Sequence, residues 1–404
     1  MKSISTFSIQ KLFGLYDYKI AFQDNNLILI GENGSGKTTI MNVLFYFLTK
    51  QWEELVSINF DSISIKFIGH AKLLTVTRKE IEEFLSFRHG RLYLFSENQH
   101  VQKMSQNLNM ISGVLTKIFE DSFILYLPTF RRIENKRQLS EKITDGLPHF
   151  EDSSEEKNYK MLKEFGMDDV HMQNMVYSNR LKDKYVKSLN RLNKQYLNDI
   201  LEGSYEKDGT ILLNYSRDKL VYAVDSIDVH LLPKSNKERL KHVFNQIANK
   251  ESEESTDREK ILSHYLLLLL TSQIDIQKQR INMSLFVSRC NKYLHGKHLV
   301  FDENLLSYKL INEDGKELQL DALSSGEKQI VSIFSYLCLS SNTNVFLMID
   351  EPELSLSVDW QRTILEDIKE CPSCKGLFAV THSPFVICDT LREYARGMGE
   401  FKKS

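Results

Sequence analysis

Gly31-Glu32-Asn33-Gly34-Ser35-Gly36-Lys37-Thr38-Thr39 matches the phosphate-binding loop pattern G-x-x-x-x-G-K-[ST] at every fixed position. The apolar run 26–30 before this loop predicts a buried strand, and the run 39–48 after it predicts a helix. Strand, loop and helix therefore follow one another in the order that phosphate binding requires. A glycine-rich turn that carried Lys-Thr by chance would need neither of these flanking elements.

The residue types in this loop suit a nucleoside triphosphate. Glycines let backbone N–H groups turn inward around the β-phosphate, and the N-terminus of the following helix adds a favourable dipole. We expect Lys37 at the β- and γ-phosphates and the Thr38 hydroxyl at Mg²⁺. The expected cofactors are ATP and Mg²⁺, and the expected nucleotide-binding residues are Asn33, Gly34, Ser35, Gly36, Lys37, Thr38 and Thr39.

Length and composition set the limits on architecture and compartment. At 404 residues the chain is long enough for two or three domains, or for one large domain with an insertion. The longest apolar run, 265–270, is far below the ~20 residues of a membrane span. Residues 1–6 carry no apolar signal region, so we expect a cytoplasmic protein. Cys371 and Cys374 form a lone C-x-x-C, which is a weak signal for metal.

Charge gives a local rather than a global hint. The formal net charge of −2 supplies no overall field for nucleic acid, so such binding would need a local patch. Apolar residues recur at helical spacing over 176–200, which predicts a long amphipathic helix. This helix could contact DNA along its backbone, although a solvated helix face is the more common origin of such a pattern. Its basic residues are Arg180, Lys182, Lys184, Lys187, Arg191 and Lys194, against only Asp183.

The first 133 residues predict a β-rich layer around the phosphate-binding loop. Residues 5–25 alternate apolar and polar side chains about a turn, which predicts a β-hairpin, and β-rich runs within 55–81 extend an antiparallel layer. A buried strand is expected at 123–127, ending at Pro128. Arg131 and Arg132 follow this strand end, where they could contact a phosphate or a partner.

Three polar segments in the last quarter of the chain accompany predicted helices and strands. Leu323-Ser324-Ser325-Gly326-Glu327-Lys328-Gln329 precedes an apolar helix expected at 330–339. The apolar strand 345–349 ends in Asp350 and Glu351, and the strand 376–380 ends at Thr381-His382-Ser383-Pro384. Ligands bind at the carboxyl ends of strands in α/β sheets, so these polar groups are expected near the phosphate-binding loop.

Phosphate hydrolysis assigns a role to each of these groups. Asp350 is expected to hold Mg²⁺ through its water shell, and Glu351 to polarise the attacking water. His382 is expected to contact the γ-phosphate. The predicted catalytic residues are thus Glu351 and His382, and the predicted metal ligands are Thr38 and Asp350.

With these motifs in this order, the chain resembles the ABC-type ATPases, in the branch whose heads are like those of SMC, RecF and OLD (overcoming-lysogenization-defect) proteins. The resemblance implies an α/β fold, with an antiparallel β-layer and a helical insertion between the two halves of the head. The implied parts are 1–133 and 299–404 for the head and 134–298 for the insertion. It also implies a dimer or higher homo-oligomer through ATP, in which Ser324, Ser325, Gly326 and Glu327 form the signature motif that contacts the nucleotide of a second subunit.

The segment 126–134 also resembles ATPase subunits of bacterial anti-phage systems of the PARIS and Septu kind. This implies a switch that controls a separate effector, a toxin or a nuclease. The chain departs from the family at Ser357-Val358, where His-Pro is usual, and no Q-loop glutamine is assigned. It also stops 22 residues past His382, without the TOPRIM nuclease of OLD proteins, so we expect no nuclease activity of its own. The alternatives are a RecF-like ATPase that binds DNA and a scaffold that binds ATP with little hydrolysis.

Overall fold

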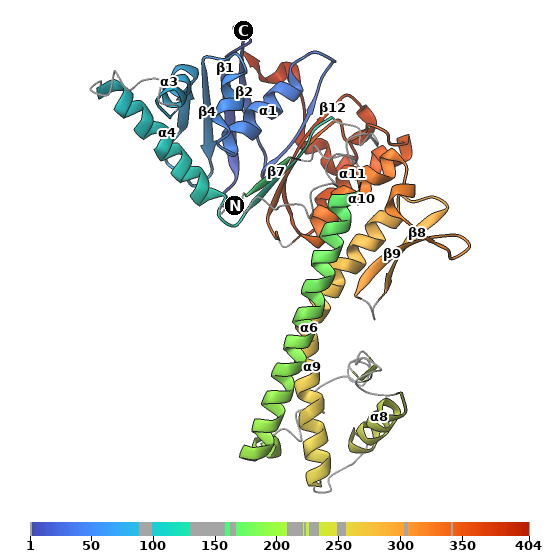
Figure 1. Ribbon diagram of the computed structural model, residues 1–404. Coiled ribbons are helices and arrows are strands. Elements are labelled where there is room, and N and C mark those ends of the chain that lie inside the picture. The colour runs from blue at the N-terminus through green and yellow to red at the C-terminus, as the bar shows by residue number, and fades with distance from the viewer. Residues whose placement is uncertain are drawn as a thin grey trace, which may run out of the picture. The chain divides into compact units, whose positions relative to one another are not determined.

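The computed structural model describes residues 2–88, 99–129, 158–161, 167–207, 221, 224–225, 234–248, 256–302, 306–340 and 342–403. The chain forms two compact units, of which the first comprises Met1–Val170 with Gln319–Ser404 and the second His171–Leu318 (Figure 1). The insertion expected at 134–298 overlaps the second unit without sharing its ends, and its boundaries stay a prediction. Arg131 and Arg132 lie outside the described residues.

A six-stranded parallel sheet forms the centre of the first unit. Its strand order is β13 (Ala395–Gly397), β3 (Asn26–Ile30), β12 (Cys374–Thr381), β11 (Val345–Asp350), β6 (Phe123–Leu127) and β7 (Tyr159–Met161). All six residues of β11 are buried, as expected for a strand covered on both faces. The register pairs Ile30 with Thr381 and Asp350 with Val380, so the carboxyl ends of these strands lie at one edge.

A five-stranded antiparallel sheet forms the second layer of the same unit. Its order is β14 (Lys402–Lys403), β2 (Tyr16–Ala21), β1 (Ile4–Leu12), β4 (Ser62–Phe67) and β5 (Leu74–Thr77). The β1–β2 pairing confirms the predicted hairpin, and β4 and β5 confirm the predicted antiparallel extension. In the chain, strands of the antiparallel layer therefore come before β3 and after α2 (Trp52–Val56), on either side of the segment that holds the phosphate-binding loop.

Helix α1 (Lys37–Leu48) packs between the two sheets and anchors the loop before it (Figure 1). Its apolar residues, such as Phe45 and Phe47, are buried in one cluster with Phe7 of β1 and Phe346 of β11. Burial of each such side chain contributes about 1.5–3 kcal/mol to folding, so the start of α1 is held by packing on both sides.

Further helices complete the first unit: α2 (Trp52–Val56), α3 (Arg78–Arg88), α4 (Gln99–Ile118), α10 (Ser325–Phe334) and α11 (Val358–Lys369). The helix predicted at 330–339 begins earlier, at Ser325, because Ser324 caps it, and it continues as a π-helix over Ser335–Leu339. The prediction of its start was wrong because it followed the apolar run and ignored the cap.

The second unit is mainly helical. It contains most of α6 (Asp168–Glu202), then α8 (Lys234–Ala248), α9 (Asp257–Asn291) and a small sheet of β8 (Lys297–Asp302), β9 (Ser307–Asn312) and β10 (Glu317–Leu318). Helices α6 and α9 lie side by side (Figure 1), joined by a 2.8 Å contact between His264 Nε2 and Asp199 Oδ2. The long helix predicted over 176–200 is confirmed. Among the described helices, none combines the length and apolarity that crossing a membrane would need.

Candidate nucleotide-binding site

The phosphate-binding loop connects β3 to α1 at the carboxyl edge of the parallel sheet. Gly34 and Gly36 have φ of 77° and 92°, in the left-handed region that glycine adopts without strain. Gly36 is the N-cap of α1 and carries no side chain that would compete for the first N–H groups. Asn33, Gly34 and Thr38 are exposed, so the loop is open to a ligand at the helix N-terminus.

Lys37 folds back across this loop, and its side chain is held by neutral acceptors. The ammonium Nζ donates to the carbonyl oxygens of Gly31 and Glu32 at 2.9 and 2.8 Å, and it lies 3.4 Å from His382 Nδ1. Lys37 is only 4% exposed, and burial lowers its pKa against the opposing effect of nearby carboxylates. A phosphate at this position would supply the negative charge that these partners lack.

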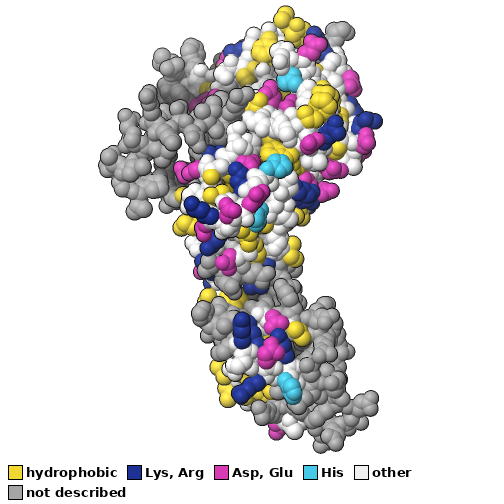
Figure 2. All heavy atoms as spheres, turned by 90° about the vertical axis from the view of Figure 1, so that its right-hand side faces the viewer, with side chains coloured by type: hydrophobic (Ala, Val, Ile, Leu, Met, Phe, Trp, Pro, Cys, Tyr) yellow, Lys and Arg dark blue, Asp and Glu magenta, His cyan; other side chains and the backbone are white. Residues whose placement is uncertain are grey.

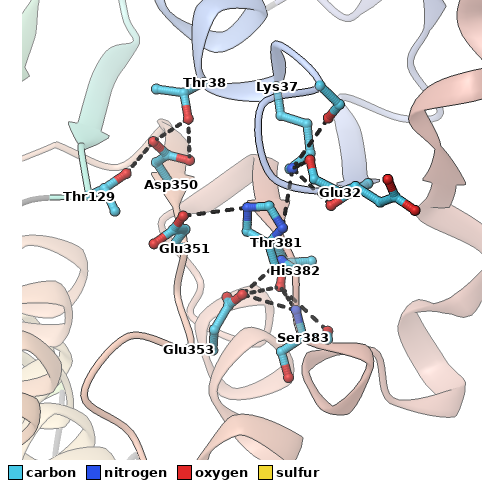
Figure 3. A network of polar contacts seen from close by, with 12 residues as sticks. Glu32, Lys37, Thr38, Thr129, Asp350, Glu351, Glu353, Thr381, His382 and Ser383 are labelled. Carbon is cyan, nitrogen blue, oxygen red and sulfur yellow. Dashed lines mark hydrogen bonds and ion pairs between the residues drawn. The ribbon is translucent and has the colours of Figure 1, made fainter.

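The Asp350 carboxylate, at the end of β11, accepts hydrogen bonds from two hydroxyl groups. Thr38 Oγ1 donates to Asp350 at 3.2 Å from Oδ1 and 2.9 Å from Oδ2, and Thr129 Oγ1 also donates to Oδ2 (Figure 3). Asp350 is 3% exposed, and burial raises the pKa of its carboxyl, while the two hydroxyl groups lower it. This donor set consists of oxygen atoms alone, which is the chemistry that Mg²⁺ prefers.

Only one carboxylate belongs to this donor set, and that also fits Mg²⁺. Mg²⁺ usually keeps several waters and binds through one or two carboxylates together with substrate phosphates. No group of three or more His, Cys, Asp or Glu side chains suited to a metal occurs in the part of the chain that the structure describes. Cys371 and Cys374 are buried, and burial raises the pKa of the Cys374 thiol to about 12.

Glu351 occupies a strained backbone position directly after Asp350. Its φ is 51°, an uncommon conformation for a residue other than glycine, and its N–H donates to Val380 O at 2.8 Å. Its Oε1 lies 3.5 Å from His382 Nε2. Burial raises the pKa of the Glu351 carboxyl, and the Asp350 charge adds to this effect. A carboxyl group with a raised pKa beside a phosphate site suits a general base.

Glu353 holds the loop that carries His382, a role that the sequence did not indicate. Glu353 Oε1 accepts hydrogen bonds from Thr381 Oγ1, His382 N and Ser383 N at 2.8, 2.8 and 3.0 Å (Figure 3). Ser383 Oγ in turn donates to Gln361 Oε1 of α11 at 2.7 Å. The His382 ring is thereby set between Lys37 and Glu351, with one nitrogen towards each.

The Leu323–Gln329 segment contains the N-cap and the first residues of α10. Ser324 and Glu327 form a capping box, in which Ser324 N donates to Glu327 Oε2 at 2.7 Å. Gly326 lies against the loop after β11, because a Cβ atom there would sit 2.4 Å from Ser355 O. Glycine is therefore required at 326 by packing within the chain. The contact of Ser324, Ser325, Gly326 and Glu327 with a second subunit's nucleotide stays a prediction.

Comparisons with known proteins agree with this geometry. The AAA ATPase domain family matches residues 1–387. The chain is 22% identical over 423 aligned residues to the Retron Vc95 probable ATPase of Vibrio cholerae serotype O1 biovar El Tor, covering 96% of this chain and 72% of that protein. The family match confirms the prediction of an ATPase domain; the finer resemblance to PARIS and Septu subunits stays a prediction.

Solved structures of Smc head domains are also similar to this chain. One from Pyrococcus furiosus, with an extended coiled coil and bound to the C-terminal domain of ScpA, is 12% identical with a TM-score of 0.38, over 96% of this chain and 91% of that one. One from Pyrococcus yayanosii, with a coiled coil and joint, is 15% identical with a TM-score of 0.34, over 96% and 93%.

Proposed function

The chain belongs to the AAA ATPase domain family, and on that premise we propose that it binds ATP with Mg²⁺ and hydrolyses it to ADP and phosphate. One observation supports this most strongly. Four polar groups from three separate segments, Lys37, Asp350 with Glu351, and His382, meet at the carboxyl edge of one parallel sheet. Lys37 and His382 are in contact, His382 and Glu351 are in contact, and Glu351 adjoins Asp350 in the chain.

In the proposed reaction each group has one task. The backbone of the phosphate-binding loop and Lys37 bind the β- and γ-phosphates, while Thr38 and Asp350 would hold Mg²⁺. Mg²⁺, when bound, neutralises charge on the phosphate oxygens. Glu351 orients the attacking water and accepts its proton. His382, fixed by Glu353 at its backbone, donates a hydrogen bond to the γ-phosphate.

We further propose that hydrolysis drives a switch. Two copies would close on ATP, with the segment Ser324–Glu327 of each contacting the nucleotide of the other, and the closed state would hold or release an effector protein. The effector would be a toxin or a nuclease of bacterial anti-phage defence. The resemblance of 126–134 to PARIS and Septu ATPase subunits supports this role, as does the similarity to the Retron Vc95 probable ATPase.

Purification from the native gene neighbourhood tests the switch proposal. We expect the tagged chain to retain a toxin-like or nuclease protein in a fixed stoichiometric ratio, identified by mass spectrometry. Mixing with ATP should change the amount retained, because only a ligand that distinguishes two states can shift their populations. A chain that purifies with DNA and without a protein partner contradicts the effector role and favours the RecF-like alternative.

One observation favours nucleic-acid binding as a second function. Five of the six basic residues of α6 share one face, because their spacing of 4, 3, 4 and 3 residues keeps them within about 80° of the helix circumference and along about 21 Å of its axis. All are exposed: Arg180, Lys184, Lys187, Arg191 and Lys194. We call this set the basic stripe. By contrast, the face of the molecule in Figure 2 mixes Lys and Arg with Asp and Glu.

Charge reversal within the basic stripe tests this second function. Lys184→Glu with Arg191→Glu should weaken binding to a duplex DNA by 10-fold or more, and should make the binding less sensitive to salt, because fewer counterions are released. Fluorescence anisotropy at several salt concentrations gives both quantities. The matched control is Lys182→Glu, which lies on another side of α6. Equal affinity and equal salt slope for the variant and the unchanged protein would exclude the stripe as a DNA contact.

A further inference from the structure

We propose that Thr129 is a positioning residue of the magnesium site, which fixes the Asp350 carboxylate through a hydrogen bond. This inference rests on the proposed ATP-binding function and adds to it a residue that follows a fourth strand of the sheet, β6. No role for Thr129 was predicted from the sequence, and its hydroxyl group contacts Asp350, 221 positions away in the chain.

The strand order explains how Thr129 comes to lie at this site. Strand β6 pairs in parallel with β11, and Leu127, the last residue of β6, lies opposite Ile349. Thr129 comes two residues after Leu127, and Asp350, the last residue of β11, comes one residue after Ile349. Thr129 and Asp350 therefore leave neighbouring strands at the same edge, and the side chains meet (Figure 3).

A second contact fixes β6 relative to the phosphate-binding loop. Tyr126 Oη donates to Asn42 Oδ1 of α1 at 2.6 Å, and the Tyr126 ring packs against Phe45 with 5.0 Å between ring centroids. Because α1 begins at Lys37, these contacts tie the end of β6 to the helix that carries Lys37 and Thr38. Thr129 thus extends from a strand whose position is already set against the phosphate-binding loop.

The two hydroxyl groups on Asp350 have different tasks in this proposal. Both donate to Oδ2, and Thr38 also lies within 3.2 Å of Oδ1. Thr38 Oγ1 would bind Mg²⁺ through a lone pair while its O–H donates to Asp350, whereas Thr129 has the single task of donating to the carboxylate. Thr129 thereby retains the carboxylate in a buried position where an unsupported anion would be costly. Residues that support metal ligands in this way typically change metal affinity by about 10- to 100-fold when removed.

Thr129→Val removes the hydroxyl group with little change of shape and tests the proposal. The measured quantity is the Mg²⁺ concentration that gives half of the Mg²⁺-dependent gain in affinity for a fluorescent ATP analogue. We expect Thr129→Val to raise this concentration by about 10-fold or more, with the affinity in EDTA unchanged. Thr129→Ser keeps the hydroxyl group, so the Mg²⁺ concentration that it needs should lie within about 2-fold of that of the unchanged protein. Thr116→Val is the matched control, because Thr116 is exposed on α4.

The outcomes separate this inference from the proposed function. An unchanged Mg²⁺ requirement in Thr129→Val overturns the positioning role, as does a loss of affinity that is equal in EDTA and in Mg²⁺, since that indicates a general disturbance of the fold. Should Thr129→Val not fold, Thr129→Ala is expected to show the same shift, and its absence there also overturns the role. Failure of the unchanged protein to bind the analogue would contradict the proposed function itself.

Discussion

Glu351→Gln should reduce ATP turnover by about 10²- to 10⁴-fold, the usual contribution of a general base, and should leave ATP binding within a few-fold of the unchanged protein. The carboxamide keeps the shape of the side chain and cannot accept the proton of the attacking water. Glu351 is held for this task by its backbone, with φ at 51° and its N–H bonded to Val380 O. Its raised pKa, caused by burial and by Asp350, makes it a better proton acceptor than an ordinary carboxylate.

Phosphate release and equilibrium binding together decide this result. Glu120→Gln, an exposed residue of the same unit, is the matched control and should turn over ATP at the unchanged rate. A Glu351→Gln protein with full turnover would show that another group activates the water. If the protein is instead a scaffold that binds ATP with little hydrolysis, the unchanged protein should already hydrolyse ATP slowly. Glu351→Gln should then not lower the hydrolysis rate.

The local parts of this site could be predicted from the sequence because each is a short pattern next to a periodic element. The phosphate-binding loop between 26–30 and 39–48 is one such part, and Asp350 and Glu351 after an apolar strand are another. Their convergence at one edge also followed, since parallel strands present their carboxyl ends together. The predicted hairpin and the long helix now seen as α6 were equally local.

The supporting contacts could not be predicted, because they depend on which strands are neighbours. Nothing in the chain order places β6 beside β11, so Thr129 was passed over while the adjacent Arg131 and Arg132 were considered. Glu353 follows Glu351 by two residues in the chain, yet its three hydrogen-bond donors lie at the end of β12 and in the two residues after it. Gly326 was interpreted as a phosphate contact, whereas Ser355 O gives it a packing reason as well.

Lys37→Ala should weaken ATP binding by about 10²- to 10³-fold, which corresponds to the loss of one partner of a buried charge pair. The Lys37 ammonium is buried and is bonded to carbonyl oxygens, a hydroxyl group and an imidazole. Its charge is therefore best compensated when phosphate is present, so the substitution should remove far more binding energy than folding energy. Burial lowers the pKa of Lys37, and the negative charge of a bound phosphate should raise it again.

Thermal unfolding with and without ATP separates these two effects. ATP at 100 times its Kd should stabilise the unchanged protein by about 2.7 kcal/mol, and at the same concentration this gain should fall to about 0.4 kcal/mol or less for Lys37→Ala. Without ATP, the two proteins should unfold at similar temperatures, because the hydrogen-bond acceptors of Lys37 in the described part of the chain carry no negative charge. The control is Lys66→Ala, an exposed residue of β4 that should keep the full ATP effect. Tight ATP binding by Lys37→Ala would overturn the assignment of the phosphate site, and with it every role derived from Asp350, Glu351 and His382.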